Sequence, residues 1–232
     1  MINSAFRSLI PESVAGLAPG THFETYGVGL DQKIEPTHTY FLVQGEFLNS
    51  DVTRTVGMLT NDVTGGAPLT PTNPGSTRQS LDFAEKSLVV TVNQLLWDDW
   101  AVGARYKLTD ANLDGGSNIP ASVPGASALR PDVSATLNQL YLYVIYQHPC
   151  GFFGQFDTVW SEQSNRGYSP GLPGDDFWQF NVYAGYRFFQ RRAEVRLGVV
   201  NLSDRDYRLN PLTLYNELPR ERMFTAALKF NF

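Results

Sequence analysis

Apolar and polar side chains alternate along most of this chain, and a helical period of hydrophobic residues is hard to find. Because successive side chains of a β-strand point to opposite faces, this pattern predicts two-faced strands. We count nine such segments, at about 21–30, 39–50, 78–95, 100–109, 136–147, 152–162, 178–188, 194–199 and 224–232.

One of these segments changes phase. In 78–95, Leu88 and Val90 alternate in one phase, whereas Leu81 and Phe83 follow the other. A β-bulge adds one residue to a strand and reverses its phase. We therefore expect a bulge near residues 85–86.

Short and long connections alternate between the predicted strands. The long ones, rich in Gly and Pro, are 51–77, 110–133, 164–176 and 203–221. This regularity is typical of antiparallel transmembrane β-barrels, which have short periplasmic turns and long external loops. The fold class expected is therefore all-β, an antiparallel transmembrane β-barrel segment of about nine strands.

The direction of the strands makes a further prediction about domain organisation. If the short links are periplasmic, the first and last strands both run inward, and residues 1–20 are the remnant of an external loop. A complete bacterial barrel has an even number of strands with both ends inside. We therefore expect residues 1–232 to be the C-terminal part of a larger barrel, with 21–232 forming its strands and loops.

Composition narrows the function classes. The net charge of −5 and the absence of a basic cluster argue against nucleic-acid binding. No run approaches the roughly 18 apolar residues of a spanning helix, which excludes a helical membrane protein. A barrel fits the mean hydropathy of −0.23, because only every second residue of its strands is apolar.

The segment 196–211, "RLGVVNLSDRDYRLNP", followed by "PRERMFTAALKFNF", resembles the last two strands of TonB-dependent outer-membrane receptors. The family phrase has the form G-x-x-N-L-x-D-x-x-Y-R, and the matching residues are Gly198, Asn201, Leu202, Asp204, Tyr207 and Arg208. The Asn and Asp suit a strand end that turns into a loop. Tyr207 is expected to anchor at the membrane interface.

The resemblance implies a function and partners. Members of that family take up a scarce ligand, such as an iron chelate, a cobalamin or a glycan, with energy from the TonB complex. The plug domain and the TonB-contacting box lie N-terminal in the family, so contact with the TonB complex is expected through an upstream plug. The resemblance also implies the outer membrane and its lipid as surroundings, no enzymatic activity and no cofactor.

The last strand carries a second family pattern. Apolar residues at alternate positions before a terminal Phe resemble the signal that the barrel-assembly machinery reads, and the residues concerned are Phe224, Leu228, Phe230 and Phe232. Such a signal can act by adding a strand to an exposed edge. The simpler interpretation is a lipid-facing or core strand, and the two are compatible.

Candidate metal and catalytic chemistry is weak. Asp110, Asn112 and Asp114 in "DANLDG" match the start of a calcium loop, but the Glu required at the twelfth position is replaced by Ala121. No His or Cys pairing suits zinc, and no G-x-S-x-G elbow is present, so no catalytic residue is assigned.

The charged residues on the face opposite the apolar set are expected to form a wet, mutually compensating wall: Glu46, Arg105, Lys107, Asp157, Arg187, Glu194 and Arg196. Two alternatives remain open. One is a passive porin or a structural outer-membrane anchor. The other is a soluble β-sandwich or lipocalin-like binder, which would turn its apolar face inward and its charges outward.

Overall fold

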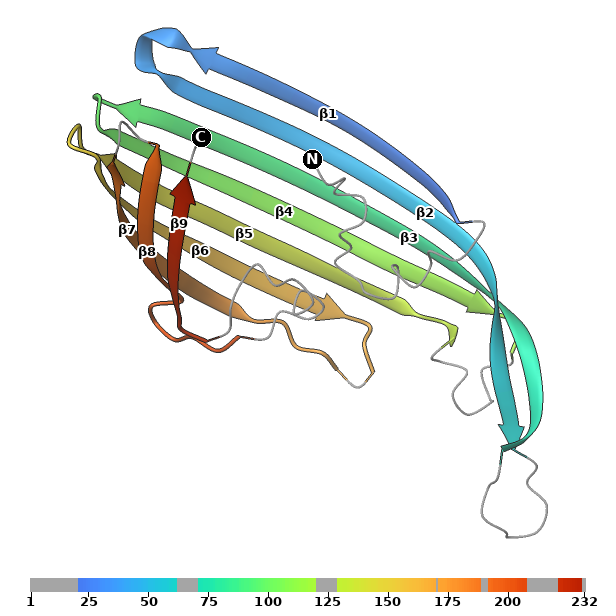
Figure 1. Cartoon of the computed structure of the whole chain (residues 1–232). Coiled ribbons are helices and arrows are strands. Elements are labelled where there is room, and N and C mark those ends of the chain that lie inside the picture. The colour runs from blue at the N-terminus through green and yellow to red at the C-terminus, as the bar shows by residue number, and fades with distance from the viewer. Residues whose placement is uncertain are drawn as a thin grey trace.

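Within the described residues, nine antiparallel strands form one sheet in which each strand pairs with its neighbours in the chain (Figure 1). The computed structural model describes residues 21–61, 71–119, 129–169, 171–188, 192–207 and 221–230. The nine predicted strands are confirmed. Their bounds, with one 3-10 turn, are β1 (His22–Ile34), η2 (Glu35–Thr37), β2 (Thr39–Asn61), β3 (Pro71–Leu96), β4 (Trp100–Ser117), β5 (Asp132–Gln147), β6 (Phe152–Arg166), β7 (Asp176–Phe188), β8 (Ala193–Val200) and β9 (Met223–Phe230).

Helix is nearly absent from the described part of the chain. Its helical element, η2, has three residues. None of the described helices has the length and apolar character needed to cross a membrane.

Several strands run further than the sequence pattern predicts. β2 continues to Asn61 and β3 starts at Pro71, so most of the expected loop 51–77 is strand. β4 likewise continues to Ser117 inside the expected loop 110–133. The sequence pattern underestimated the lengths of β2 and β3 because these two strands remain hydrogen-bonded to each other past the ends of the neighbouring strands. There they project from the sheet as a two-stranded ribbon (Figure 1).

The two faces of the sheet differ in chemistry. We call the face that carries Val43, Val90 and Val144 the outer face, and the face that carries Gln44, Tyr143 and Asp157 the inner face. The exposed large hydrophobic side chains of the strands lie on the outer face, with the exceptions of Phe23, Leu95 and Met223.

The predicted bulge at residues 85–86 is wrong. β3 pairs with β2 in continuous register from Gln94 through that position, and the register between these two strands shifts at Thr60/Asn61 instead. The phase change instead marks a change of environment. Leu81 and Phe83 point to the inner face and belong to a buried cluster with Leu48, Val52, Ala111, Leu113, Val133, Ala135 and Leu137.

Among the strands that the structure describes, the two outermost have open edges. β1 and β9 lie at opposite ends of the strand order and do not pair with each other. Every residue of β1 is exposed, and β9 is exposed at all but one position. The sheet is therefore curved but not closed (Figure 1).

Candidate functional site

A continuous apolar band crosses the outer face. On β4 it runs from Trp100 to Leu108, and on β6 from Phe152 to Trp160. Eight residue steps at about 3.3 Å give the band a length of about 26 Å along each strand. The alternation of the sequence places these residues on one face, and the pairing of the strands joins them into one surface.

Aromatic rings lie at both ends of the band. Trp160 and Trp178 pair across β6 and β7 with ring centroids 6.3 Å apart, at the end toward the long connections. We call this the upper end. Trp100 and Tyr146 pair at the lower end with centroids 4.7 Å apart.

The band crosses the sheet obliquely. Its upper end lies at Phe47 on β2 and at Phe224 on β9. The pairings from β9 back to β2 place Phe224 in the same cross-strand row as Thr39 of β2. Thr39 lies eight residues below Phe47 on β2, so the upper end of the band descends by eight residues between β2 and β9. Eight residues at about 3.3 Å, over seven strand spacings of about 4.8 Å, correspond to a slope of about 40°.

The inner face at the level of the band is polar. Asp157 is 4% exposed, and its carboxylate accepts hydrogen bonds from Gln155 Nε2 at 2.9 Å and Asn181 Nδ2 at 2.7 Å. Arg196 Nη2 donates to Gln155 Oε1 at 3.1 Å. A buried carboxylate needs such donors, because unpaired burial of a charge is costly.

The seven charged residues predicted to share a wall do lie on the inner face, by the register of their strands. The expected compensation is clearest for Arg187 and Glu194, whose Nε and Oε2 are 2.8 Å apart and whose side chains are each 25% exposed. Arg187 also donates to Gln147 at 3.0 Å and lies 4.4 Å from the centroid of the Phe153 ring.

The Asn-Leu-x-Asp part of the sequence motif forms a hydrogen-bonded turn around Asn201, which is fully buried and has a positive φ of 53°. Its Oδ1 accepts from the Arg205 backbone N–H, and its Nδ2 donates to the Arg205 carbonyl, both at 3.0 Å. Its own backbone N–H donates to Asn181 Oδ1 at 3.0 Å. Asn tolerates the left-handed conformation, which explains its place at this turn.

The same turn holds the start of β9. Asp204 Oδ1 accepts from the Arg222 backbone N–H at 2.8 Å, and Arg222 Nε donates to the Leu202 carbonyl at 3.2 Å. The Leu202 backbone N–H donates to the carbonyl of Phe180 on β7 at 2.8 Å. The phrase therefore links β7 to β9 beyond the end of β8.

The prediction that Tyr207 anchors at a membrane interface is wrong. The ring is 4% exposed and stacks on Phe177, with centroids 4.5 Å apart and planes 9° apart. Phe177 lies on the inner face of β7, so the chain after Asn201 folds over that face. Gly198 lies opposite Tyr183, whose ring covers it, and Arg208 lies outside the described residues.

The calcium-loop hypothesis is also contradicted. Asp110, Asn112 and Asp114 lie in the extended strand β4, spaced along its outer face. A calcium loop must curl its ligands around one point, which an extended strand cannot do. Asp110 instead accepts a hydrogen bond from Thr136 at 2.8 Å, and the described residues contain no group of three His, Cys, Asp or Glu that could hold a metal ion.

The residues of the predicted assembly signal lie on the exposed outer face of β9. Phe224, Leu228 and Phe230 are 77%, 61% and 55% exposed. Phe232 lies outside the described residues. Recognition by the assembly machinery stays a prediction.

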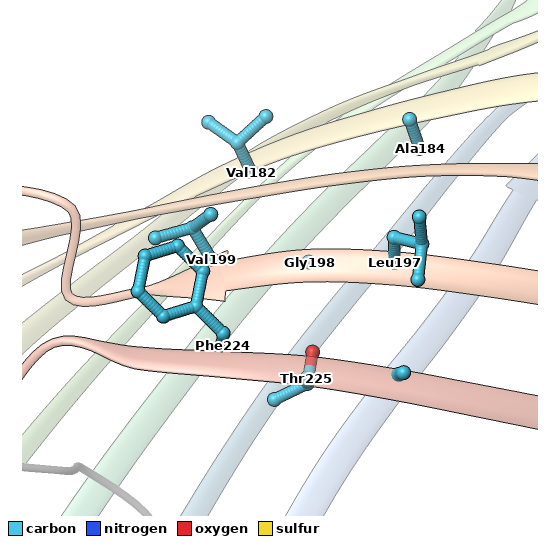
Figure 2. Close-up of a pocket in the computed structure, with 8 residues that line it drawn as sticks. Val182, Ala184, Leu197, Gly198, Val199, Phe224 and Thr225 are labelled. Atoms are coloured by element: carbon cyan, nitrogen blue, oxygen red, sulfur yellow. The ribbon is translucent and has the colours of Figure 1, made fainter.

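An apolar hollow of about 450 Å³ lies within the band, over β7, β8 and β9 (Figure 2). Ala184 and Ala226 are small outer-face residues on either side of Leu197, and Val182, Val199 and Phe224 form the next row toward the upper end. The hollow thus follows from side-chain size within the band.

Comparison with known proteins adds no relative: no family model, curated protein or solved structure matches this chain.

The sequence analysis did not predict the hydrogen-bonded amide network around Asp157, whose members come from the three strands β6, β7 and β8. The available signal was the run of amides at inner positions, Gln155, Gln179 and Asn181.

Proposed function

We propose that this chain forms part of the wall of an outer-membrane β-barrel that transports a ligand. The observation that carries the proposal is the oblique apolar band on the outer face. Transmembrane barrels have an apolar band about 25 Å tall with aromatic girdles, and their strands tilt by about 35–45°. The length, the aromatic ends and the slope of about 40° of this band fit that geometry.

The distribution of polar groups supports the same proposal. At the level of the band, apolar side chains lie outside and charged and amide side chains lie inside. A soluble lipocalin-like binder needs the reverse arrangement, because its outer face contacts water. An exposed apolar surface of this size favours contact with lipid.

The open edges support the proposal that this sheet is one part of a closed wall. In lipid, unpaired backbone groups are costly, so barrels close on themselves. The eight antiparallel pairings make β1 and β9 run in the same direction. Closure through antiparallel pairs alone therefore requires an odd number of additional strands.

The transport class follows from the resemblance to TonB-dependent receptors. We propose active uptake, with substrate capture by the connections at the upper end and energy from the TonB complex through a plug. Barrel-assembly machinery would insert the protein in the outer membrane. The turn from Asn201 to Asp204 fixes the start of β9 and thereby the final pairing of the wall.

Two neighbouring residues of β5 provide the test of the barrel. Val144 lies on the outer face and Ile145 on the inner face, and both are half-buried aliphatic residues. In protein folded into lipid vesicles, Val144→Arg should lower the free energy of unfolding by about 2–4 kcal/mol, and Ile145→Arg by much less. Equal effects, or a monodisperse monomer in plain buffer, would contradict the proposal.

Conductance separates active uptake from a passive porin. The complete protein from its native membrane, inserted in a planar lipid bilayer, should show no steady open-channel current if a plug fills the lumen. A stable, voltage-independent current would favour the porin and overturn the TonB-dependent mechanism while leaving the barrel intact.

A further inference from the structure

Glycines on the inner face follow a rule at the level of the band. Gly103, Gly185 and Gly198 lie in inner-face positions of β4, β7 and β8. Each is directly opposite an aromatic residue of a neighbouring strand, Tyr143, Phe153 and Tyr183 respectively. A Cβ atom added at any of the three glycines would overlap that ring.

The rings use the space in different ways. Tyr143 crosses Gly103 and its hydroxyl donates to Asn93 on β3 at 2.8 Å. An arginine guanidinium lies over each of the other two rings. Arg187 is 4.4 Å from the centroid of Phe153, and Arg196 is 4.0 Å from the centroid of Tyr183. An aromatic ring that covers a cross-strand glycine replaces the missing side-chain contacts of that strand.

β1 breaks this rule. Gly27 and Gly29 are inner-face residues at the level of the band, but the β2 residues opposite them are Glu46 and Gln44. A Cβ at either position would meet only backbone oxygens at ordinary contact distance, 3.6 Å from Gly45 O and 3.7 Å from Val43 O. Both glycines are exposed, whereas the three covered glycines are partly buried.

We infer that the free edge of β1 pairs with a strand that carries an aromatic residue on its inner face, and that this ring covers Gly27 or Gly29. The edge offers backbone groups along thirteen residues, and β2 is its paired neighbour among the described strands. A partner strand is thus defined by hydrogen bonding along the edge and by one ring at a stated position.

β9 does not fit this description. Its inner-face residues within the described strand are Met223, Thr225, Ala227 and Lys229, none of them aromatic. β9 also runs in the same direction as β1, so it would pair with β1 only in parallel, in this copy or in a second copy with the same membrane orientation. The partner is therefore an additional strand of the wall. This inference rests on the proposed function, because it is the proposed barrel that requires the edge of β1 to be paired.

Alanine substitution in the complete protein in lipid tests the ring. Gly103→Ala is the covered control, and Gly45→Ala is the open control, because a Cβ at Gly45 would lie 3.9 Å from Val28 Cγ1. Overpacking of this kind lowers the ratio of folded to unfolded protein by about 5- to 150-fold. We expect that loss for Gly27→Ala or Gly29→Ala, as for Gly103→Ala. If both behave like Gly45→Ala, the inference is overturned.

Photo-crosslinking identifies the partner even where a variant folds poorly. A benzophenone amino acid replaces Thr25, an inner-face residue two positions from Gly27, in the complete protein in its native membrane. We expect a crosslinked peptide from an added strand with an aromatic residue, mapped by mass spectrometry. A crosslink to β9 of a second copy, to a peptide without an aromatic residue, or to no other strand overturns the inference. The Val144→Arg result then separates this failure from failure of the barrel itself.

Discussion

The lower and upper parts of the central strands carry their apolar side chains on opposite faces. At the level of the band, β3 presents Val90 and Val92 on the outer face, whereas farther up the same strand Leu81 and Phe83 are buried on the inner face. No bulge separates the two parts, so the backbone is continuous while the apolar side changes. The side that is apolar therefore follows the surroundings at each height and not a change in the strand.

The proposed membrane surface explains this difference. In the barrel that we propose, the outer face of the band would meet lipid and the inner face a polar lumen. Above the band, the exposed residues of the outer face include Asp51, Asp82, Asp114 and Asp132 in one cross-strand row, which suits the contact with water that the proposal implies there. The inner face there packs as a small protein core. Under this proposal, the line where the apolar side changes marks the upper boundary of the lipid contact.

The largest effect is expected in the upper core. Phe83 is 6% exposed, and Phe83→Ala should cost about 3–5 kcal/mol of the free energy of unfolding through lost burial and a residual cavity. Urea unfolding in lipid vesicles measures this loss. The matched change Val90→Ala on the outer face of the same strand should cost less, and a reversed order would contradict the comparison.

An arginine placed at two different heights on the outer face of β3 tests where the proposed lipid contact ends. Val92→Arg places a guanidinium in the band and should cost about 2–4 kcal/mol, with the largest value at the bilayer midplane. Asp82→Arg, on the same face of β3 but above the band, should be neutral or stabilising because Asp82 is exposed and faces Asp51 and Asp114. Similar losses from both variants would place Asp82 in lipid and break the comparison.

At the β8–β9 end of the sheet, a turn lies at the upper end of the band. β8 ends at Val200, one residue above the band. Asn201 closes the turn: its backbone N–H donates to Asn181 Oδ1, its side chain bonds both backbone groups of Arg205, and its carbonyl accepts from the Asp204 backbone N–H. Asn201→Ala removes its buried side-chain bonds and should cost about 1–3 kcal/mol. Hydrogen exchange at Arg222, whose N–H binds Asp204, should rise with it. Unchanged exchange would mean that the turn does not hold β9.

The smallest effect is expected from the row of aspartates above the band. Like charges directly opposite each other destabilise a sheet, so Asp82→Asn should raise the free energy of unfolding by about 0.2–1 kcal/mol at neutral pH and low salt. High salt should remove the gain, because exposed charges are screened. Ser80→Asn, one outer-face position away on the same strand, serves as the control. A salt-independent gain would argue against charge repulsion.

The sequence by itself determined the nine strands and, outside the first half of β3, the side to which their residues point. Alternation is a local property, since it depends on neighbours in the chain, and it placed the seven inner charges and the outer residues of β9 correctly. It could not separate a bulge from a change of environment in β3. It also could not tell that "DANLDG" continues a strand, because its pairing with β3 and β5 is not written in its own residues.

Only the tertiary structure decided how the strands are set against one another. Register depends on hydrogen bonds between residues far apart in the chain, and it alone gives the band its slope. The same holds for the family phrase, where Asn201 meets Asn181 and Asp204 meets Arg222 across strands. Tyr207 stacks inward on Phe177 for this reason, although its local sequence resembles an interface anchor. Local pattern fixes which way a side chain points, and long-range pairing fixes what it meets.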